Sequence, residues 1–169
     1  VTSGKTLSKS YTGFEDTAYT SQASVPWNSN MISIKNVYFN NEISPISLAY
    51  WFYNAKSITS FSTTNLNMNK VTNMAYAFYN SSLTGNLICG NNVTNMYRTY
   101  YACFQLTGSP VCGNKVTNMV DTYYNCSALT GSPVCGNNVT SMYRTYYHCT
   151  NLTGNPICGD KVTDRKSVV

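Results

Sequence analysis

Charge is scarce in this 169-residue chain. Charged residues make up 10% of it, and only six residues are Asp or Glu. Between residues 17 and 120 the only carboxylate is Glu42. Most of the chain therefore lacks the pair of carboxylates that general acid–base catalysis requires. The eleven Lys and Arg give a net charge of +5, but they form no basic run of the kind that binds nucleic acid.

Other marks of catalysis and of metal binding are also missing. His148 is the single histidine, so a Ser-His-Asp set has almost no support, and no Cys-x-x-Cys spacing indicates zinc. Glycine-rich phosphate-binding motifs and apolar stretches of membrane-spanning length are absent. We therefore predict a non-enzymatic protein with no catalytic residue, no cofactor, no metal site, no nucleic-acid partner and no membrane insertion.

What the chain has instead is a repeat. A Val-Thr pair recurs at spacings of 22, 23, 23 and 23 residues, beginning at Val71, Val93, Val116, Val139 and Val162. The unit between them is clearest from Leu129 to Cys149. A fixed period in this range is typical of a solenoid, in which each repeat buries its apolar face only against its neighbours.

Each repeat predicts a short strand, a tight turn and a short helix. Counting the Val of each Val-Thr pair as position 0, apolar residues recur at positions +3 and +7, which together form one helical face. This periodicity predicts that Met96, Tyr100, Met119, Tyr123, Met142 and Tyr146 are buried. We expect the Thr of each pair to be a helix N-cap and the Gly of each Cys-Gly turn to take a positive φ.

The strands are expected to start near Ile34, Ile58, Leu83, Leu106, Leu129 and Leu152. Pro110, Pro133 and Pro156 each remove a hydrogen-bond donor, so these strands should be very short or bent. The predicted fold is an α/β solenoid, a leucine-rich-repeat-like stack of short parallel strands and short helices with a period of about 23 residues.

The repeats divide the chain into three parts. Residues 33–164 form the predicted solenoid, with five repeats plus one incomplete repeat, and residues 1–32 do not repeat and are a linker or partial N-terminal cap. Residues 165–169 are a C-terminal tail. The chain begins at Val1 without a signal-peptide pattern, so either a leader has been removed or this is a piece of a longer protein.

Two segments carry a family resemblance. Residues 71–84 read Val-Thr-Asn-Met-Ala-Tyr-Ala-Phe-Tyr-Asn-Ser-Ser-Leu-Thr, and residues 51–61 read Trp-Phe-Tyr-Asn-Ala-Lys-Ser-Ile-Thr-Ser-Phe. Over residues 26–164 the chain resembles the BspA-like leucine-rich repeat family, although Thr-Tyr-Tyr replaces the usual Met-Phe and the strand contains Gly-Ser-Pro. The resemblance implies a right-handed α/β solenoid on a bacterial surface or in a phage fibre, acting as an adhesin or interaction module.

The seven cysteines alternate at spacings of 14 and 9 residues from Cys89 to Cys158. Counting does not choose between disulfides across nine and across fourteen residues. Geometry argues against both, because they join opposite ends of a strand about 20 Å long, whereas a disulfide needs Cα atoms within about 7 Å. Stacked coils place the cysteines in two columns instead. We prefer buried thiols, with disulfides between adjacent coils as the alternative.

The expected surface of the helical half is rich in tyrosine and arginine. Position +8 is always Tyr, whose rings either form an aromatic platform for a partner or stack on one another between coils, which we favour. Positions +5 and +9 are expected to point outward. Tyr and Arg are enriched in interface hot spots, so the predicted partner-binding residues are Tyr97, Arg98, Tyr101, Tyr143, Arg144 and Tyr147.

Two functions remain open from the sequence. One is a surface-exposed interaction module, adhesin-like or in a phage fibre or decoration domain, binding a protein or glycan on a cell surface. The other is a structural repeat unit or spacer that assembles end to end with a neighbouring subunit, as a homo-oligomer through its solenoid ends. Both predict an extracellular location, on a bacterial or virion surface.

Overall fold

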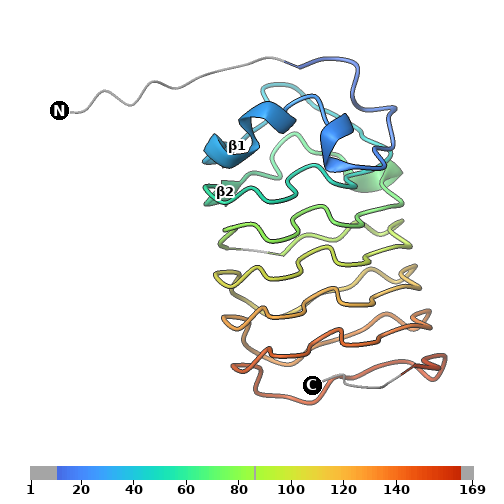
Figure 1. The fold of residues 1–169 in the computed structure, drawn as a ribbon. Helices are drawn as coiled ribbons and strands as arrows, with labels where there is room; N and C mark the ends of the chain where they lie inside the picture. Colours follow the sequence, from blue (N-terminus) through green and yellow to red (C-terminus); the bar gives the residue numbers. More distant parts are fainter. Residues whose placement is uncertain (1–10, 86, 165–169) are drawn as a thin grey trace.

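The computed structural model describes residues 11–85 and 87–164. In that part the chain winds into coils that lie one below another along a single axis (Figure 1). Regular elements are few and short: the 3-10 helices η1 (Gln22–Ser24), η2 (Asn28–Ser33) and η3 (Met68–Lys70), and the strands β1 (Asn36–Val37) and β2 (Ser60–Phe61). β1 and β2 pair in parallel, with Asn36 opposite Ser60.

Successive repeats are stacked neighbours. Position +2 of each coil forms a parallel bridge with position +2 of the next, in the series Ser47, Asn73, Asn95, Asn118, Ser141 and Asp164. The Val-Thr pairs follow the same register: the Thr94 amide donates to the Thr72 carbonyl at 2.8 Å, and the Thr117 amide to the Thr94 carbonyl at 2.9 Å. The sequence period is thus the length of one coil, while the leucine-rich-repeat-like class stays a prediction.

The prediction of a helix in each repeat is wrong, because the described residues contain no α-helix. Amides there donate alternately within the coil and to the next coil. Tyr100 shows the pattern: its amide reaches the Thr122 carbonyl of the next coil at 2.9 Å, and its carbonyl accepts from the Cys103 amide three residues on, at 3.1 Å. The next coil therefore supplies the carbonyl acceptors that, in an α-helix, the residue four positions earlier would provide.

Left-handed backbone conformations explain why no helix forms. Positions +5 and +9 have positive φ in each of the five coils in which the structure describes them, for example 52° at Arg98 and 56° at Ala102. A right-handed helix does not accommodate such residues. Position +9 holds Asn54, Asn80, Asn125 and His148 in the other coils, and Asn and His tolerate this conformation better than most residues.

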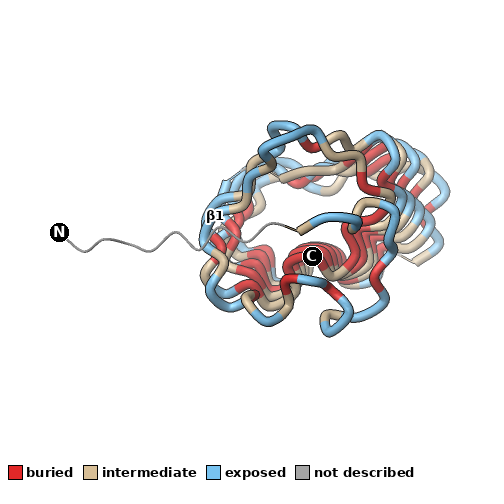
Figure 2. Tube along the Cα trace, turned by 90° about the horizontal axis from the view of Figure 1, so that it is seen from above, coloured by how far each residue is buried: buried red, intermediate tan, exposed pale blue. Residues whose placement is uncertain are grey.

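The helical periodicity nevertheless places the correct side chains inside. Met96, Tyr100, Met119, Tyr123, Met142 and Tyr146 all have an exposed fraction of 0%, so the predicted core is confirmed. Viewed along the stack, buried positions superpose from coil to coil on the inner side (Figure 2). Tyr100, Tyr123 and Tyr146 stack face to face at 5.5 and 5.6 Å between ring centroids.

Buried Tyr and Thr hydroxyls of this core find partners across or between coils, whereas the buried Trp51 Nε1 has none among the described residues. The Tyr100 hydroxyl donates to the Ile88 carbonyl at 2.9 Å and accepts from the Ile88 amide at 3.1 Å, which ties the two halves of one coil together. The buried Thr122 hydroxyl donates to the Met96 carbonyl of the preceding coil at 2.8 Å. These bonds satisfy groups whose burial is otherwise costly.

The predicted strands in the other half of each coil are mostly absent. The strands expected near Ile34 and Ile58 are present as β1 and β2, but residues near Leu83, Leu106, Leu129 and Leu152 form no strand in the described chain. In this half of the coils, Val134 and Ile157 form the one parallel bridge among the described repeats that contain Gly-Ser-Pro or Gly-Asn-Pro. Pro110, Pro133 and Pro156 each remove a ladder donor from their repeats, whereas the repeat that begins near Leu83 lacks a strand without containing a proline.

Two residue roles also differ from those predicted. The Thr side chains are not helix caps, because the hydroxyl of Thr94 donates to the Thr72 carbonyl at 3.1 Å and so joins coils. The Cys-Gly glycines do not take a positive φ; Gly108 and Gly131 do. Gly113 is needed instead for close approach, since a Cβ there would lie 2.6 Å from the Gly90 carbonyl oxygen.

Residues 11–33 lie across the N-terminal end of the stack. The buried Trp27 packs edge-on against Trp51 at 5.3 Å and stacks with Phe52 at 6.0 Å, and Val25 and Met31 are buried beside it. These side chains keep the apolar interior of the first coil away from water. The rest of the predicted 1–32 segment, residues 1–10, and the 165–169 tail lie outside the described residues.

Candidate interaction surface

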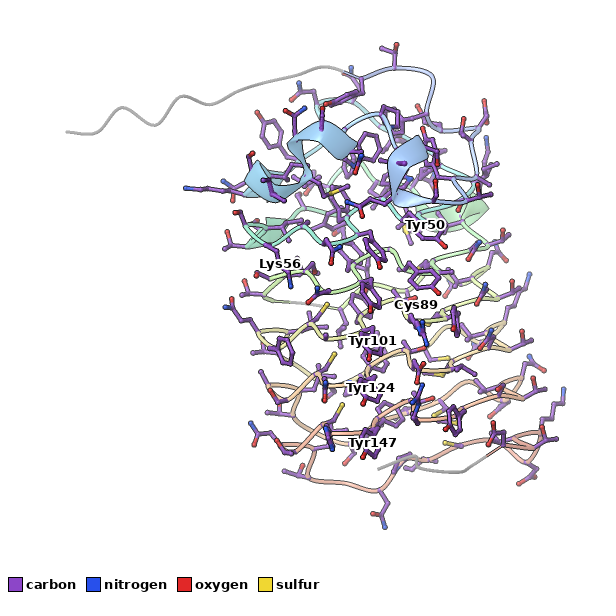
Figure 3. The ribbon with its side chains drawn as sticks, viewed as in Figure 1. Tyr50, Lys56, Cys89, Tyr101, Tyr124 and Tyr147 are labelled. Atoms are coloured by element: carbon purple, nitrogen blue, oxygen red, sulfur yellow. The ribbon has the colours of Figure 1, made fainter. Side chains whose placement is uncertain are left out.

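A column of tyrosine rings runs along one side of the stack at position +8. Tyr53, Tyr79, Tyr101, Tyr124 and Tyr147 stack in turn, with ring centroids 4.6, 4.8, 4.6 and 5.2 Å apart. Figure 3 shows Tyr101, Tyr124 and Tyr147 one above another. All five side chains are half-buried.

The stacking determines which part of each ring a partner can meet. Both faces of Tyr79, Tyr101 and Tyr124 are covered by the rings above and below, at interplanar angles between 1° and 22°. Offset stacking of this kind stabilises neighbouring coils. The exposed part of the column is therefore made of ring edges, and the interpretation that we favoured from the sequence, stacking between coils, describes this geometry.

Beside the tyrosines, position +5 carries three charged residues in consecutive coils. The Arg98 Nε donates to Asp121 Oδ2 at 3.0 Å, while Arg144 donates through Nε to Oδ1 at 2.9 Å and through Nη2 to Oδ2 at 3.0 Å. The Asp121 side chain is 1% exposed, and the two arginine side chains are 31% and 33% exposed. One buried carboxylate thus holds two half-exposed guanidinium groups.

Aromatic rings complete the setting of both arginines. The Arg98 guanidinium carbon lies 5.0 Å from the Tyr97 ring centroid and 5.6 Å from that of Tyr101. The Arg144 carbon lies 4.7 Å from the Tyr143 centroid and 5.3 Å from that of Tyr124. Cation–π attraction favours these positions. The hydrogen bond with Asp121, opposed by burial, raises the pKa of Arg144.

The structure brings all six predicted partner-binding residues around Asp121 and Tyr124. Tyr97 and Tyr101 flank Arg98, and Tyr143 flanks Arg144; Tyr147 instead stacks on Tyr124 and on the His148 ring. The tyrosine–arginine surface is defined here as Tyr97, Arg98, Tyr101, Asp121, Tyr124, Tyr143, Arg144 and Tyr147.

Asp121 is the residue that sequence reasoning missed. Positions +5 and +9 were expected to point outward, but Asp121 is 1% exposed and Ala102 at position +9 is 8% exposed. The expectation fails because the segment is not helical, so the angle of 100° per residue does not apply. The available signal was Arg, Asp and Arg at one position of consecutive coils, where opposite charges lie close enough to pair.

All seven cysteines are free thiols. Cys103, Cys126 and Cys149 form one buried column, and their Sγ atoms donate to carbonyls of the preceding coil at 3.0, 2.9 and 2.9 Å. Burial raises the pKa of Cys103 to about 11 and that of Cys149 to about 12. These thiols are core residues rather than nucleophiles.

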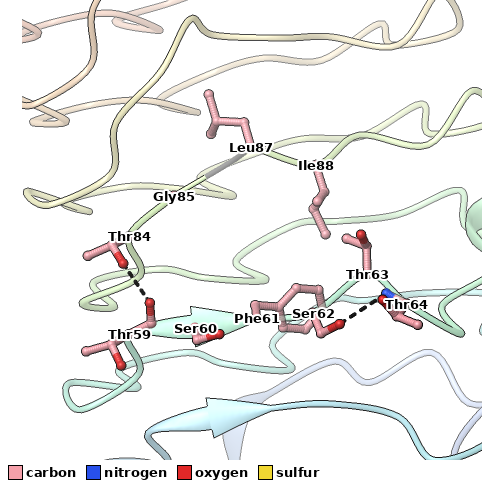
Figure 4. Close-up of a pocket in the computed structure, with 10 residues that line it drawn as sticks. All are labelled: Thr59, Ser60, Phe61, Ser62, Thr63, Thr64, Thr84, Gly85, Leu87 and Ile88. Atoms are coloured by element: carbon pink, nitrogen blue, oxygen red, sulfur yellow. Dashed lines mark hydrogen bonds between the residues drawn. The ribbon is translucent and has the colours of Figure 1, made fainter.

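The open hollow shown in Figure 4 is lined by residues 59–64 together with Thr84, Gly85, Leu87 and Ile88. Its only interactions drawn are a Thr84 hydroxyl donating to the Thr59 carbonyl at 2.6 Å and a Thr64 amide donating to the Ser62 hydroxyl at 3.2 Å. It contains no titratable side chain.

Residues 11–85 and 87–164 contain no group of three or more His, Cys, Asp and Glu side chains that could hold a metal ion. No helix in this part of the chain has the length and apolar character needed to cross a bilayer. No protein-family model, no curated protein and no solved structure matches this chain.

Proposed function

We propose that this chain is a non-enzymatic interaction module, exposed on a bacterial cell surface or on a virion, and that it binds a protein partner through the tyrosine–arginine surface. The observation that supports this most directly is the double pairing of Asp121 with Arg98 and Arg144. Held side chains lose little further freedom on binding, which lowers the entropic cost of association.

The cluster has charge and donors left for a partner. Its two arginines and one aspartate give it a net positive charge. Within residues 11–85 and 87–164, Nη1 and Nη2 of Arg98 and Nη1 of Arg144 have no hydrogen-bond acceptor. The two guanidinium groups converge on one carboxylate, because Arg98 Nε and Arg144 Nη2 each lie 3.0 Å from Asp121 Oδ2. A partner with an acidic side chain at this point would complement them.

The stacked tyrosines favour a protein over a glycan. Sugars bind aromatic residues mostly through a ring face, and here the faces of Tyr101 and Tyr124 are covered by one another and by Tyr79 and Tyr147. Ring edges and guanidinium groups suit the mixed apolar and polar contacts of a protein interface.

The test is binding of the labelled chain to a protein array and a glycan array, comparing wild type with an Arg98→Ala/Arg144→Ala variant. We expect wild type to bind protein features and the variant to bind them at least about tenfold more weakly, as hot-spot arginines do. The matched control is Lys115→Ala/Lys161→Ala, which removes the same charge from exposed lysines that donate to Asn92 and Asn138. Equal loss in both variants, or binding confined to the glycan array, would contradict the proposal.

A second candidate is a structural unit that assembles end to end. It is supported by the uniformity of the ladder, since the Thr163 amide donates to the Thr140 carbonyl at 3.0 Å as in each coil before it. Another coil of the same kind could add to such an edge. Sedimentation of the chain with and without a polar capping repeat after Asp164 separates the candidates: loss of assembly with the cap alone favours the structural unit.

A further inference from the structure

The second cysteine column, Cys89, Cys112, Cys135 and Cys158, changes its contacts at one place. Cys89 Sγ accepts a hydrogen bond from the Gly113 amide of the next coil at 3.1 Å, and Cys112 Sγ accepts one from the Gly136 amide at 3.4 Å. Cys135 departs from this pattern. Its Sγ lies 3.0 Å from Cys158 Sγ in the next coil, so two thiols are in direct contact.

In this half of the repeats, the backbone beside this pair also has the most regular hydrogen bonding between coils. Val134 and Ile157 form a parallel bridge, in which the Cys135 amide donates to the Ile157 carbonyl at 3.0 Å and the Ile157 amide to the Pro133 carbonyl at 3.1 Å. Adjacent strands place neighbouring Cα atoms about 4.8 Å apart, within the range that a disulfide spans. Closing the sulfur atoms to about 2.0 Å requires a movement of about 1 Å.

Accessibility differs between the two thiols. Cys135 is 6% exposed, whereas Cys158 is half-buried and can meet a small molecule from solvent. The thiols of the other column, Cys103, Cys126 and Cys149, are buried and already donate to carbonyl oxygens. The described chain therefore offers one pair of cysteines that is both in contact and open to solvent on one side.

We propose that Cys135 and Cys158 are a site of covalent modification, at which a low-molecular-weight disulfide such as oxidised glutathione joins two adjacent coils through a protein disulfide. The Cys158 thiolate attacks one sulfur of the small disulfide, which gives a mixed disulfide and releases one thiolate. Cys135 then loses its proton to solvent and attacks Cys158 Sγ, which releases the second. Two protein thiols are oxidised and one small disulfide is reduced to two thiols.

The bond has a structural consequence at the C-terminal part of the stack. It closes a loop of one coil and so restricts the unfolded chain, which should raise the thermal midpoint by roughly 5–10 °C. An extracellular location, as proposed above, is a setting in which such a bond persists. Burial and the contact with Cys158 raise the pKa of Cys135, so the second step should become faster as pH rises.

The experiment equilibrates the full chain in oxidised and in reduced glutathione, counts free thiols in denaturant and maps linked peptides. Cleavage after Lys115, Arg144 and Lys161 places Cys135 and Cys158 on separate peptides, and fragmentation separates them from Cys126 and Cys149. We expect two thiols per chain to be lost, a 135–158 link, and a higher thermal midpoint in the oxidised sample.

Two variants test whether this pair alone is responsible. Cys158→Ser should abolish the oxidation-dependent shift of the thermal midpoint, and the control Cys112→Ser, in the same column, should keep it. Absence of a 135–158 link at equilibrium, links spread over other cysteines, or loss of the shift in Cys112→Ser would each overturn the proposal. If Cys158→Ser does not fold, the peptide map of wild type decides by itself.

Discussion

Replacing Asp121 by Asn tests whether the buried carboxylate holds the tyrosine–arginine surface together. The two side chains have nearly the same shape, and Asn tolerates the left-handed backbone that Asp121 adopts, at φ 54°. The substitution therefore changes charge and hydrogen bonding without adding backbone strain. It places an NH2 group, a donor, opposite guanidinium groups that are themselves only donors.

The expected cost follows from the contacts and their burial. Asp121 accepts three N–H bonds of 2.9–3.0 Å while 1% exposed. Removing one partner of a fully buried ion pair costs about 3–5 kcal/mol. Here the arginine side chains are 31% and 33% exposed, so hydrogen bonds with water replace part of the lost interaction. Burying the neutral Asn side chain also costs less free energy than burying a carboxylate. We expect the free energy of unfolding to fall by about 2 kcal/mol.

Urea unfolding of both proteins at pH 7 measures this difference. The matched control is Asp160→Asn, the same chemical change at an exposed turn residue, for which a change within about 0.5 kcal/mol is expected. Raising the salt concentration should reduce the effect of Asp121→Asn only slightly, because a buried pair is weakly screened. A loss below about 0.5 kcal/mol, or an equal loss in the control, would refute the view that Asp121 organises the surface.

Three further predictions concern the core and the stacking of coils. Truncating the fully buried Met119 to Ala should lower the free energy of unfolding by roughly 2–5 kcal/mol in urea, whereas no change would mean that the inner side has been misassigned. Gly113→Ala should lower the thermal midpoint, because the new Cβ would lie 2.6 Å from the Gly90 carbonyl oxygen. The control is Gly13→Ala, whose new Cβ meets nothing within 4 Å and which therefore adds only backbone strain. In reductant, the free energy of unfolding should fall as pH rises from about 9 to about 11. Unfolded thiols ionise near their ordinary pKa of 9.0, while burial raises the pKa of Cys103 and Cys112 to about 11 in the native state. A urea midpoint that is independent of pH over this range would contradict this prediction.

The sequence by itself determined the length of the coil and the content of the core. Val, Met and Tyr recur at positions 0, +3 and +7, and hydrophobic burial acts on them whatever the backbone conformation. This is why Met96 and Tyr100 are buried although the segment that carries them is not a helix. The recurrence of a Val-Thr pair likewise predicted which segments stack, because identical repeats bury identical faces.

Only the tertiary structure decided the backbone conformation and the direction of side chains at positions +5 and +9. The choice between a helix and a series of turns depends on carbonyl acceptors in the next coil, such as that of Thr122 for the Tyr100 amide, and a local pattern does not contain them. The same holds for Asp121 and for Cys135. The first is buried because Arg98 and Arg144 approach it from two other coils, and the second meets Cys158 because the coil after it bridges at Ile157.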